Sequence, residues 1–431
     1  MDPHGQIARR FPLVARFRPA CLPLHDRVQA LVALAGTAAT TTDQGLASAV
    51  YNQAALIASD LDLPDLARAM CHQHAAAYLH AAPLPAMTAI RALEPVVNLA
   101  RLQIRAGHAD HGRERLLRLS AAISNSTAEQ FDDVHIPADL TQTAAGRQEV
   151  RAWLWRVLLA DGARTLTSAG RWTEALAHTK EHRGIGKRMF DGRQIAVVAA
   201  LTNKDTARAA ELIADTAVGD PWEQAVTACL NALLRRSIGR PVDDQANQLE
   251  SAFLAVPAAR GMTVFEIRLG LTALDAIGSD THPAAGRIAN ALHRRVLAAN
   301  DGAAAREVMA NLLFSALATP SQAQSCRDLV KACGLGSGSL PSQLRHALQT
   351  ALQLGDRVIR DSLTPACNRR TPAPRNSPST TEVPSPPPPD GHAENLPRGT
   401  RYSRSNGADM TVADGARGSA RGAREGSCAP D

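Results

Sequence analysis

The sequence is poor in aromatic residues and has no long apolar run. Phe, Trp and Tyr together make up 3% of its 431 residues, so alanine, leucine and valine have to fill the interior. Alanine is the best helix former, and few segments show the alternation of apolar and polar residues that strands require. No apolar run approaches the ~20 residues of a membrane-spanning helix. We therefore expect an all-α protein without a membrane segment.

Paired cysteines and a secretory signal are also missing. The seven cysteines are scattered and form no CxxC pair, which argues against a disulfide framework and indicates a reducing, cytoplasmic setting. The basic N-terminal segment has neither the apolar stretch nor the cleavage pattern of a signal peptide. We expect residues 1–24 to be a disordered basic leader, or the result of a start codon assigned too early.

Common catalytic signatures are absent as well. No GxSxG or HExxH occurs, and HRGIGKR lacks the leading glycine and the Ser/Thr of a P-loop and follows a predicted helix. A formal net charge of +6 is modest, and without a zinc finger or a basic recognition helix we consider nucleic acid an improbable partner. These absences predict a protein that is not an enzyme and has no cofactor.

Two groups of candidate metal ligands were considered. Cys71, His72 and His74 lie close together, and His178 and His182 stand one helical turn apart. A metal site normally needs three or four ligands, so surface or core histidines are the simpler interpretation and we predict no metal.

Helix start and stop signals recur from about residue 25 to residue 362. Asp43 and Pro64 are placed to begin helices, Gly36 to end one, and DPWE and TPSQ are capping-box sequences at 220–223 and 319–322. Residues 303–318 are expected to form one helix, and 125–144 an irregular loop. Stacked pairs of such helices predict an α-solenoid of antiparallel hairpins over 25–362. The Pro-, Arg- and Gly-rich composition of 363–431 predicts a disordered tail.

The central stretch shows a repeat. Turns at Gly170 and Lys204 are 34 residues apart, the tetratricopeptide period. The segment SAGRWTEAL, with Ala175 and Leu176 in its second helix, resembles degenerate tetratricopeptide-like repeats, although the first helix lacks the consensus aromatic. The stretch YNQAALIASDLDLPDLARAMC is similar to uncharacterised helical proteins of high-GC bacteria. This resemblance implies a cytoplasmic interaction or regulatory role and supplies no catalytic residues.

Three functions remain open at this point. The first and favoured one is a repeat scaffold that binds a protein or peptide in its concave groove. The second is a ligand-sensing or regulatory module for a small anionic ligand or an acidic peptide, and the third is an enzyme accessory with an unrecognised site.

The loop between residues 179 and 194 is the candidate binding site. Its glycines at 184 and 186 are expected to turn backbone N–H groups toward an anion, and the following helix presents its positive end. The competing interpretation is a connector whose arginines pair with Glu174, Glu181 and Asp191. The candidate ligand- or partner-binding residues are Lys180, His182, Arg183, Lys187, Arg188 and Arg193.

Overall fold

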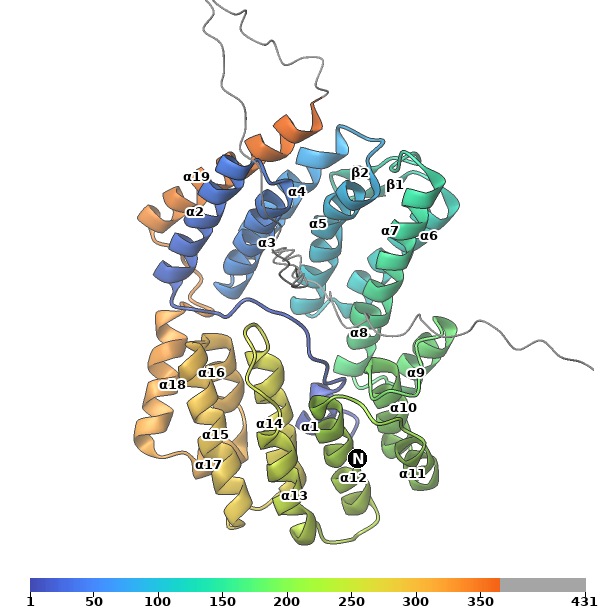
Figure 1. Cartoon of the computed structure of the whole chain (residues 1–431), viewed down its shortest axis with the longest axis vertical. Helices are drawn as coiled ribbons and strands as arrows, with labels where there is room; N and C mark the ends of the chain where they lie inside the picture. Colours follow the sequence, from blue (N-terminus) through green and yellow to red (C-terminus); the bar gives the residue numbers. More distant parts are fainter. Residues whose placement is uncertain (365–431) are drawn as a thin grey trace, which may run out of the picture.

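The computed structural model describes residues 1–364. This part of the chain is almost entirely α-helical, as predicted, and its helices form two lobes that lie one above the other (Figure 1). Among the described residues, no helix combines the length and the apolarity needed to cross a membrane. Beyond Leu363 and Thr364, the predicted tail lies outside the described residues.

The first lobe, drawn at the top of Figure 1, is built on one apolar core. Its helices are α2 (Leu24–Thr41), α3 (Gln44–Asp60), α4 (Pro64–Leu79), α5 (Ala86–Arg105), α6 (Ala109–Asn125), α7 (Ala144–Val157) and α19 (Ser342–Leu363). A short antiparallel hairpin, β1 (Glu129–Phe131) and β2 (Val134–Ile136), lies where an irregular loop was predicted. Phe131 and Ile136 are buried in the lobe, so side-chain burial orders this segment.

The second lobe has a separate apolar core. It contains α1 (Gln6–Arg10), α8 (Ala163–Ser168), α9 (Trp172–Glu181), α10 (Asp191–Thr202), α11 (Thr206–Ala214), α12 (Pro221–Ser237), α13 (Asp243–Leu254), α14 (Thr263–Ile277), α15 (Pro283–Ala299), α16 (Gly302–Met309), α17 (Leu312–Leu317) and α18 (Pro320–Ala332).

The chain passes between the lobes through a π-helical turn. Helix α7, the π-helix (Leu158–Gly162) and α8 follow one another with right-handed helical backbone throughout. Leu158 belongs to the core of the first lobe, and Ala163 to that of the second. A π-turn breaks the regular hydrogen-bond ladder and often marks a functional position. Here it places Asp161 at the boundary between the lobes.

The first 24 residues differ from the prediction of a disordered leader. Helix α1 packs in the second lobe, where Phe11 and Leu13 are fully buried. Gln194 holds the main chain of Leu13 by donating to its carbonyl and accepting from its N–H, both at 2.6 Å. We call residues 11–23 the strap, because they run between the lobes from α1 to α2 (Figure 1). Burial of apolar side chains and the hydrogen bonds of Gln194 hold this segment against the second lobe.

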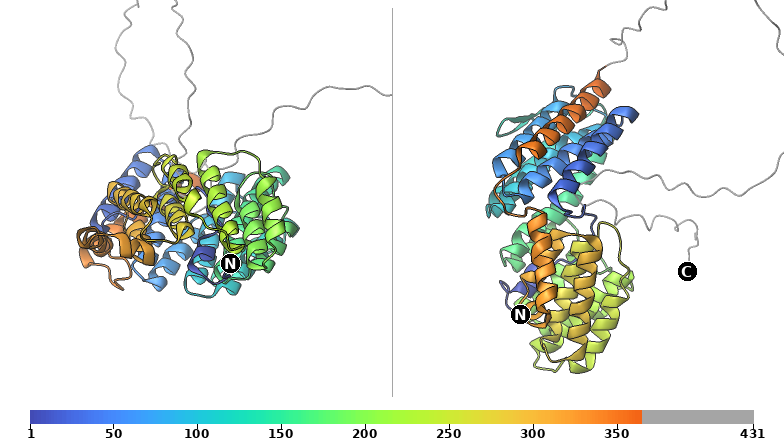
Figure 2. Two further views of the ribbon diagram at one scale, coloured as in Figure 1. Left: turned by 90° about the horizontal axis from the view of Figure 1, so that it is seen from below. Right: turned by 90° about the vertical axis from the view of Figure 1, so that its left-hand side faces the viewer.

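Helix α19 returns to the beginning of the first lobe. It packs against α2 and α3, and Gln44 donates to Ser362 across 318 residues. Figure 2 shows α19 in orange beside the blue helices. A simple solenoid has contacts only between neighbouring repeats. The contact of α19 with α2 and α3 joins elements from the two ends of the described chain, so the first lobe differs from the predicted open array.

Most of the predicted helix caps are present. The side chain of Asp43 accepts from two backbone N–H groups, and both capping boxes form. Gly36 does not end its helix, because α2 continues to Thr41. Residues 303–318 are divided at Asn311, whose side chain accepts from Phe314 N and starts a new helix. The capping asparagine explains that break.

Candidate anion-binding cleft

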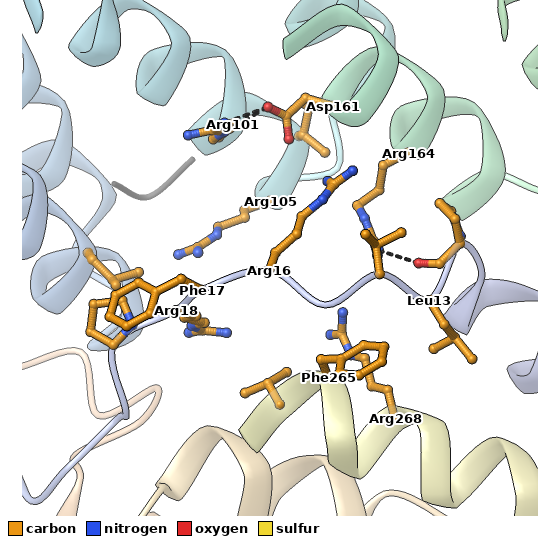
Figure 3. Close-up of a pocket in the computed structure, with 16 residues that line it drawn as sticks. Leu13, Arg16, Phe17, Arg18, Arg101, Arg105, Asp161, Arg164, Phe265 and Arg268 are labelled. Carbon is orange, nitrogen blue, oxygen red and sulfur yellow. Dashed lines mark hydrogen bonds and ion pairs between the residues drawn. The ribbon is translucent and has the colours of Figure 1, made fainter. Parts of the chain in front are cut away.

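A cavity of about 290 Å³ lies where the two lobes and the strap meet. Its walls come from the strap, α3, α5, the π-helix, α8 and α14, which are far apart in the sequence (Figure 3). Small-ligand pockets commonly occur between helices and at domain boundaries, at roughly 300–1,000 Å³. The cavity is at the small end of that range.

Arginine is the prevailing side chain of this cavity. The strap contributes two, α5 two, α8 one and α14 one, whereas Asp161 is the one carboxylate in the lining. Figure 3 shows several of their side chains directed into the shared space. The lining arginines are Arg16, Arg18, Arg101, Arg105, Arg164 and Arg268.

Most of these arginines have a carboxylate partner at the edge of the cavity. Arg101 binds Asp161 at 2.6 Å and 3.0 Å, Arg268 binds Glu307, and Arg16 binds Asp191.

The carboxylate of Asp60 lies close to three arginines. It lies 3.5 Å from Arg18 and 3.7 Å from Arg105, while Arg27, outside the lining, donates to it at 2.8 Å. Within residues 1–364, the carboxylates of residues 60, 161, 191 and 307 pair with these arginines, but only Asp161 lies in the lining itself, so arginines outnumber carboxylates in the cavity.

Arg164 has the least charge compensation of the six. It makes no ion pair with any carboxylate in residues 1–364, and its guanidinium donates to the Pro12 carbonyl at 3.0 Å. Burial, followed by repulsion from Arg268 and Arg16, lowers the pKa of Arg164 to about 10, and the attraction of Asp191 and Asp161 offsets only part of this. A partly buried cation without a direct ion pair is costly to the folded protein, and a bound anion would relieve that cost.

Apolar groups complete the cavity. Leu13, Val14 and Phe17 line it from the strap, and Phe265 lines it from α14. The ring of Phe17 is 39% exposed, which leaves it accessible. Cationic and apolar surfaces in one small cavity suit a ligand that carries both an anionic group and an apolar part.

Three of the basic residues of the predicted loop are paired with acids. Lys187 binds Asp215 at 2.6 Å, and Arg188 binds both Asp220 and Glu223. Arg193 is buried and also reaches Asp215. Ion pairs of the kind expected for a connecting loop are thus present. Their acidic partners, however, come from the segment around α11 and α12. Two of the acids expected in this role, Glu174 and Asp191, instead pair with Arg171 and Arg16.

The remaining candidate residues of the loop lie apart from the cavity lining. Lys180 and Arg183 are exposed, whereas His182 is half-buried and its Nδ1 lies 2.9 Å from the His178 carbonyl. Gly184 donates its N–H to the Thr179 carbonyl and has no left-handed φ. An added Cβ on Gly192 would lie 2.2 Å from the Gly184 carbonyl oxygen, so these two glycines allow close packing, whereas Gly186 has open space around it and its carbonyl accepts from Arg193. Anion binding by this loop stays a prediction.

Sequence reasoning missed the arginines of the cleft. They are spread over four separate segments, and each one is an ordinary polar residue of its own helix or of the strap. The pair Arg16 and Arg18 was assigned to a disordered leader. A helical sequence has no local signal for side chains that converge only when two lobes meet.

Comparisons with known proteins contribute no further assignment. No protein-family model, no curated protein and no solved structure matches this chain.

Proposed function

We propose that this protein is a regulatory module that binds a small anionic ligand in the cleft between its lobes. The excess of arginine over carboxylate in the cavity, with Arg164 lacking an ionic partner, is the observation that carries this proposal. Guanidinium groups bind phosphate and carboxylate bidentately and favour such ligands over neutral ones. This excess of arginine suits a dianion, such as a phosphate monoester with an apolar or planar group.

Ligand binding would couple the two lobes. Arg101 and Arg105 come from the first lobe, and Arg164 and Arg268 from the second. A ligand that contacts both sets stabilises the arrangement in which they converge, and so shifts the population toward it. This is the physical basis for a regulatory role.

The proposal is for binding without chemistry. Asp161, the one carboxylate of the lining, is in an ion pair with Arg101, and no histidine, serine or cysteine lines the cavity. We also propose the cytoplasm as its compartment, which is supported by the free, buried thiols of the described cysteines.

A scaffold for a protein partner is the second candidate. The cavity, of about 290 Å³, is small for a ligand pocket, so we expect such a partner to insert a short acidic segment. The exposed Phe17 ring beside the arginines favours this form of the scaffold hypothesis.

Calorimetric titration at low salt tests the proposed function. The probes are adenosine monophosphate, inorganic phosphate, uncharged adenosine and a short glutamate-rich peptide. We expect the monophosphate to bind more tightly than phosphate, adenosine to bind weakly, and affinity to fall as salt is added. Tighter binding of the peptide would select the scaffold, and no binding by any anion would contradict both.

Variants locate the site. Arg164→Gln should weaken the binding of the monophosphate by roughly 10–100-fold, because it removes a charged hydrogen-bond donor. The same change removes a poorly compensated charge and should not lower the melting temperature. Arg183→Ala, in the exposed part of the basic loop, is the matched control and should bind normally. The reverse pattern would place the ligand in the loop.

A further inference from the structure

A second site lies at the end of α9 and shares no residue with the lining of the arginine cleft. His178, Glu181 and His182 each offer one ligand atom, and these atoms all lie within 4.8 Å of one another. We propose that these three side chains bind a first-row transition-metal dication, with Zn²⁺ as the best match. This proposal does not rest on the anion-binding function.

The spacing of the residues produces the cluster. Residues three and four apart lie on one face of a helix, and a His pair at i and i+4 is the arrangement by which helical zinc motifs hold their metal. The two histidines alone would be too few for a metal site, and Glu181 supplies the third ligand. Two imidazoles and one carboxylate suit Zn²⁺ and similar ions better than Mg²⁺ or Ca²⁺.

Hydrogen bonds to carbonyl oxygens fix which nitrogen of each ring carries the lone pair. The Nε2 of His178 lies 3.0 Å from the Leu158 carbonyl, and the Nδ1 of His182 lies 2.9 Å from the His178 carbonyl. A carbonyl only accepts, so these two nitrogens carry the protons. The lone pairs are then on His178 Nδ1 and His182 Nε2. Metal-binding histidines typically donate their second N–H in this way.

The surroundings hold the buried ring in place. An added Cβ on Gly162 would come within 2.8 Å of the His178 ring, so the glycine of the π-helix makes room for it. The ligands also lie in the last turn of α9, whose negative dipole end favours a cation.

Closing the site requires small movements. Zinc bonds of about 2.1 Å place tetrahedral ligand atoms about 3.4 Å apart, closer than the 4.8 Å limit of the cluster. Glu181 is exposed and His182 half-buried, so their side chains can move toward His178. Arg113 opposes binding, because its guanidinium lies 3.4 Å from His178 Nδ1. It must turn away before the metal can use that lone pair.

Cobalt is the probe for this site. The full-length protein is titrated with Co²⁺, and its visible absorption bands are followed, then displaced with Zn²⁺. We expect Glu181→Gln and His182→Gln each to weaken the Co²⁺ signal tenfold or more while the far-ultraviolet circular dichroism stays unchanged. His111→Gln is the matched control, since His108 and His111 are an exposed pair with ring centroids 6.1 Å apart, and it should bind normally.

The opposing arginine makes the test sharper. Arg113→Ala should bind Co²⁺ several-fold more tightly than the unaltered protein, because the competing cation is gone. The proposal is overturned if no Co²⁺ bands arise, if Glu181→Gln and His182→Gln leave them unchanged, or if Arg113→Ala weakens binding.

Discussion

The interlobe cleft and the basic loop at 180–193 are both rich in arginine and lysine, yet their charges are arranged differently. In the loop, Lys187, Arg188 and Arg193 all contact carboxylates from the segment around α11 and α12. In the cleft, carboxylates are fewer than arginines, and Arg164 has none. The comparison teaches that a cluster of basic residues indicates an anion site only when its acidic neighbours are counted too.

The largest expected effect concerns the shared carboxylate of the cleft. The side chain of Asp60 is 4% exposed and contacts Arg27, Arg18 and Arg105. Asp60→Asn would leave the buried Arg27 without its carboxylate partner and should lower the free energy of unfolding by about 3–5 kcal/mol, measured by urea denaturation. It should also raise phosphate affinity, since the excess charge grows. A loss of stability below about 1 kcal/mol would mean that solvent screens these charges.

An intermediate effect is expected in the loop. The side chain of Glu223 is 1% exposed and accepts from Arg188 at 2.9 Å and 3.1 Å and from the N–H groups of Asp220 and Met189. Glu223→Gln should reduce the free energy of unfolding by about 1.5–3 kcal/mol at neutral pH. Asp220→Asn, at an exposed partner of the same arginine, is the control and should cost less.

The effect of Glu223 also depends on pH in a defined direction. Burial raises the pKa of Glu223, but Arg188 and the backbone donors outweigh it, so the pKa is below its ordinary value. Because the pKa of Glu223 is lower in the folded protein than in the unfolded chain, its carboxylate contributes its full stabilisation above the unfolded pKa of about 4.3. That contribution is lost as the pH falls through the folded-state pKa. The difference between Glu223→Gln and the unaltered protein should therefore shrink as the pH falls below about 4.3. A difference that grows in acid would reverse this assignment.

The smallest effect is expected at the surface of the loop. Lys187 and Asp215 are 68% and 57% exposed, so Lys187→Ala should change the free energy of unfolding by less than about 0.5 kcal/mol. Arg193 still compensates Asp215 in this variant. Phosphate binding should also be unchanged, as measured by the same calorimetry. A marked loss of phosphate affinity would mean that the anion binds in the loop and not in the cleft.

Much of the secondary structure follows from local signals. Asp43, Pro64 and the capping boxes at 220–223 and 319–322 mark helix starts correctly, because a cap depends on residues within one turn. The same local reasoning misplaced the end of α2 at Gly36, since an isolated glycine lowers helix propensity by about 1 kcal/mol and tertiary packing can override that.

The sequence by itself determined the helical class, through its alanine-rich composition and its caps, and it pointed to a basic loop whose charges are close in the chain. Only the tertiary structure decided which charges remain without partners. Burial of Phe11 and Leu13 turns the expected leader into the strap, and the return of α19 closes the first lobe. Arg18, Arg105 and Arg164 meet because separate elements pack together. Coulomb interactions depend on distance in space, and for residues this far apart in the chain that distance is set by packing.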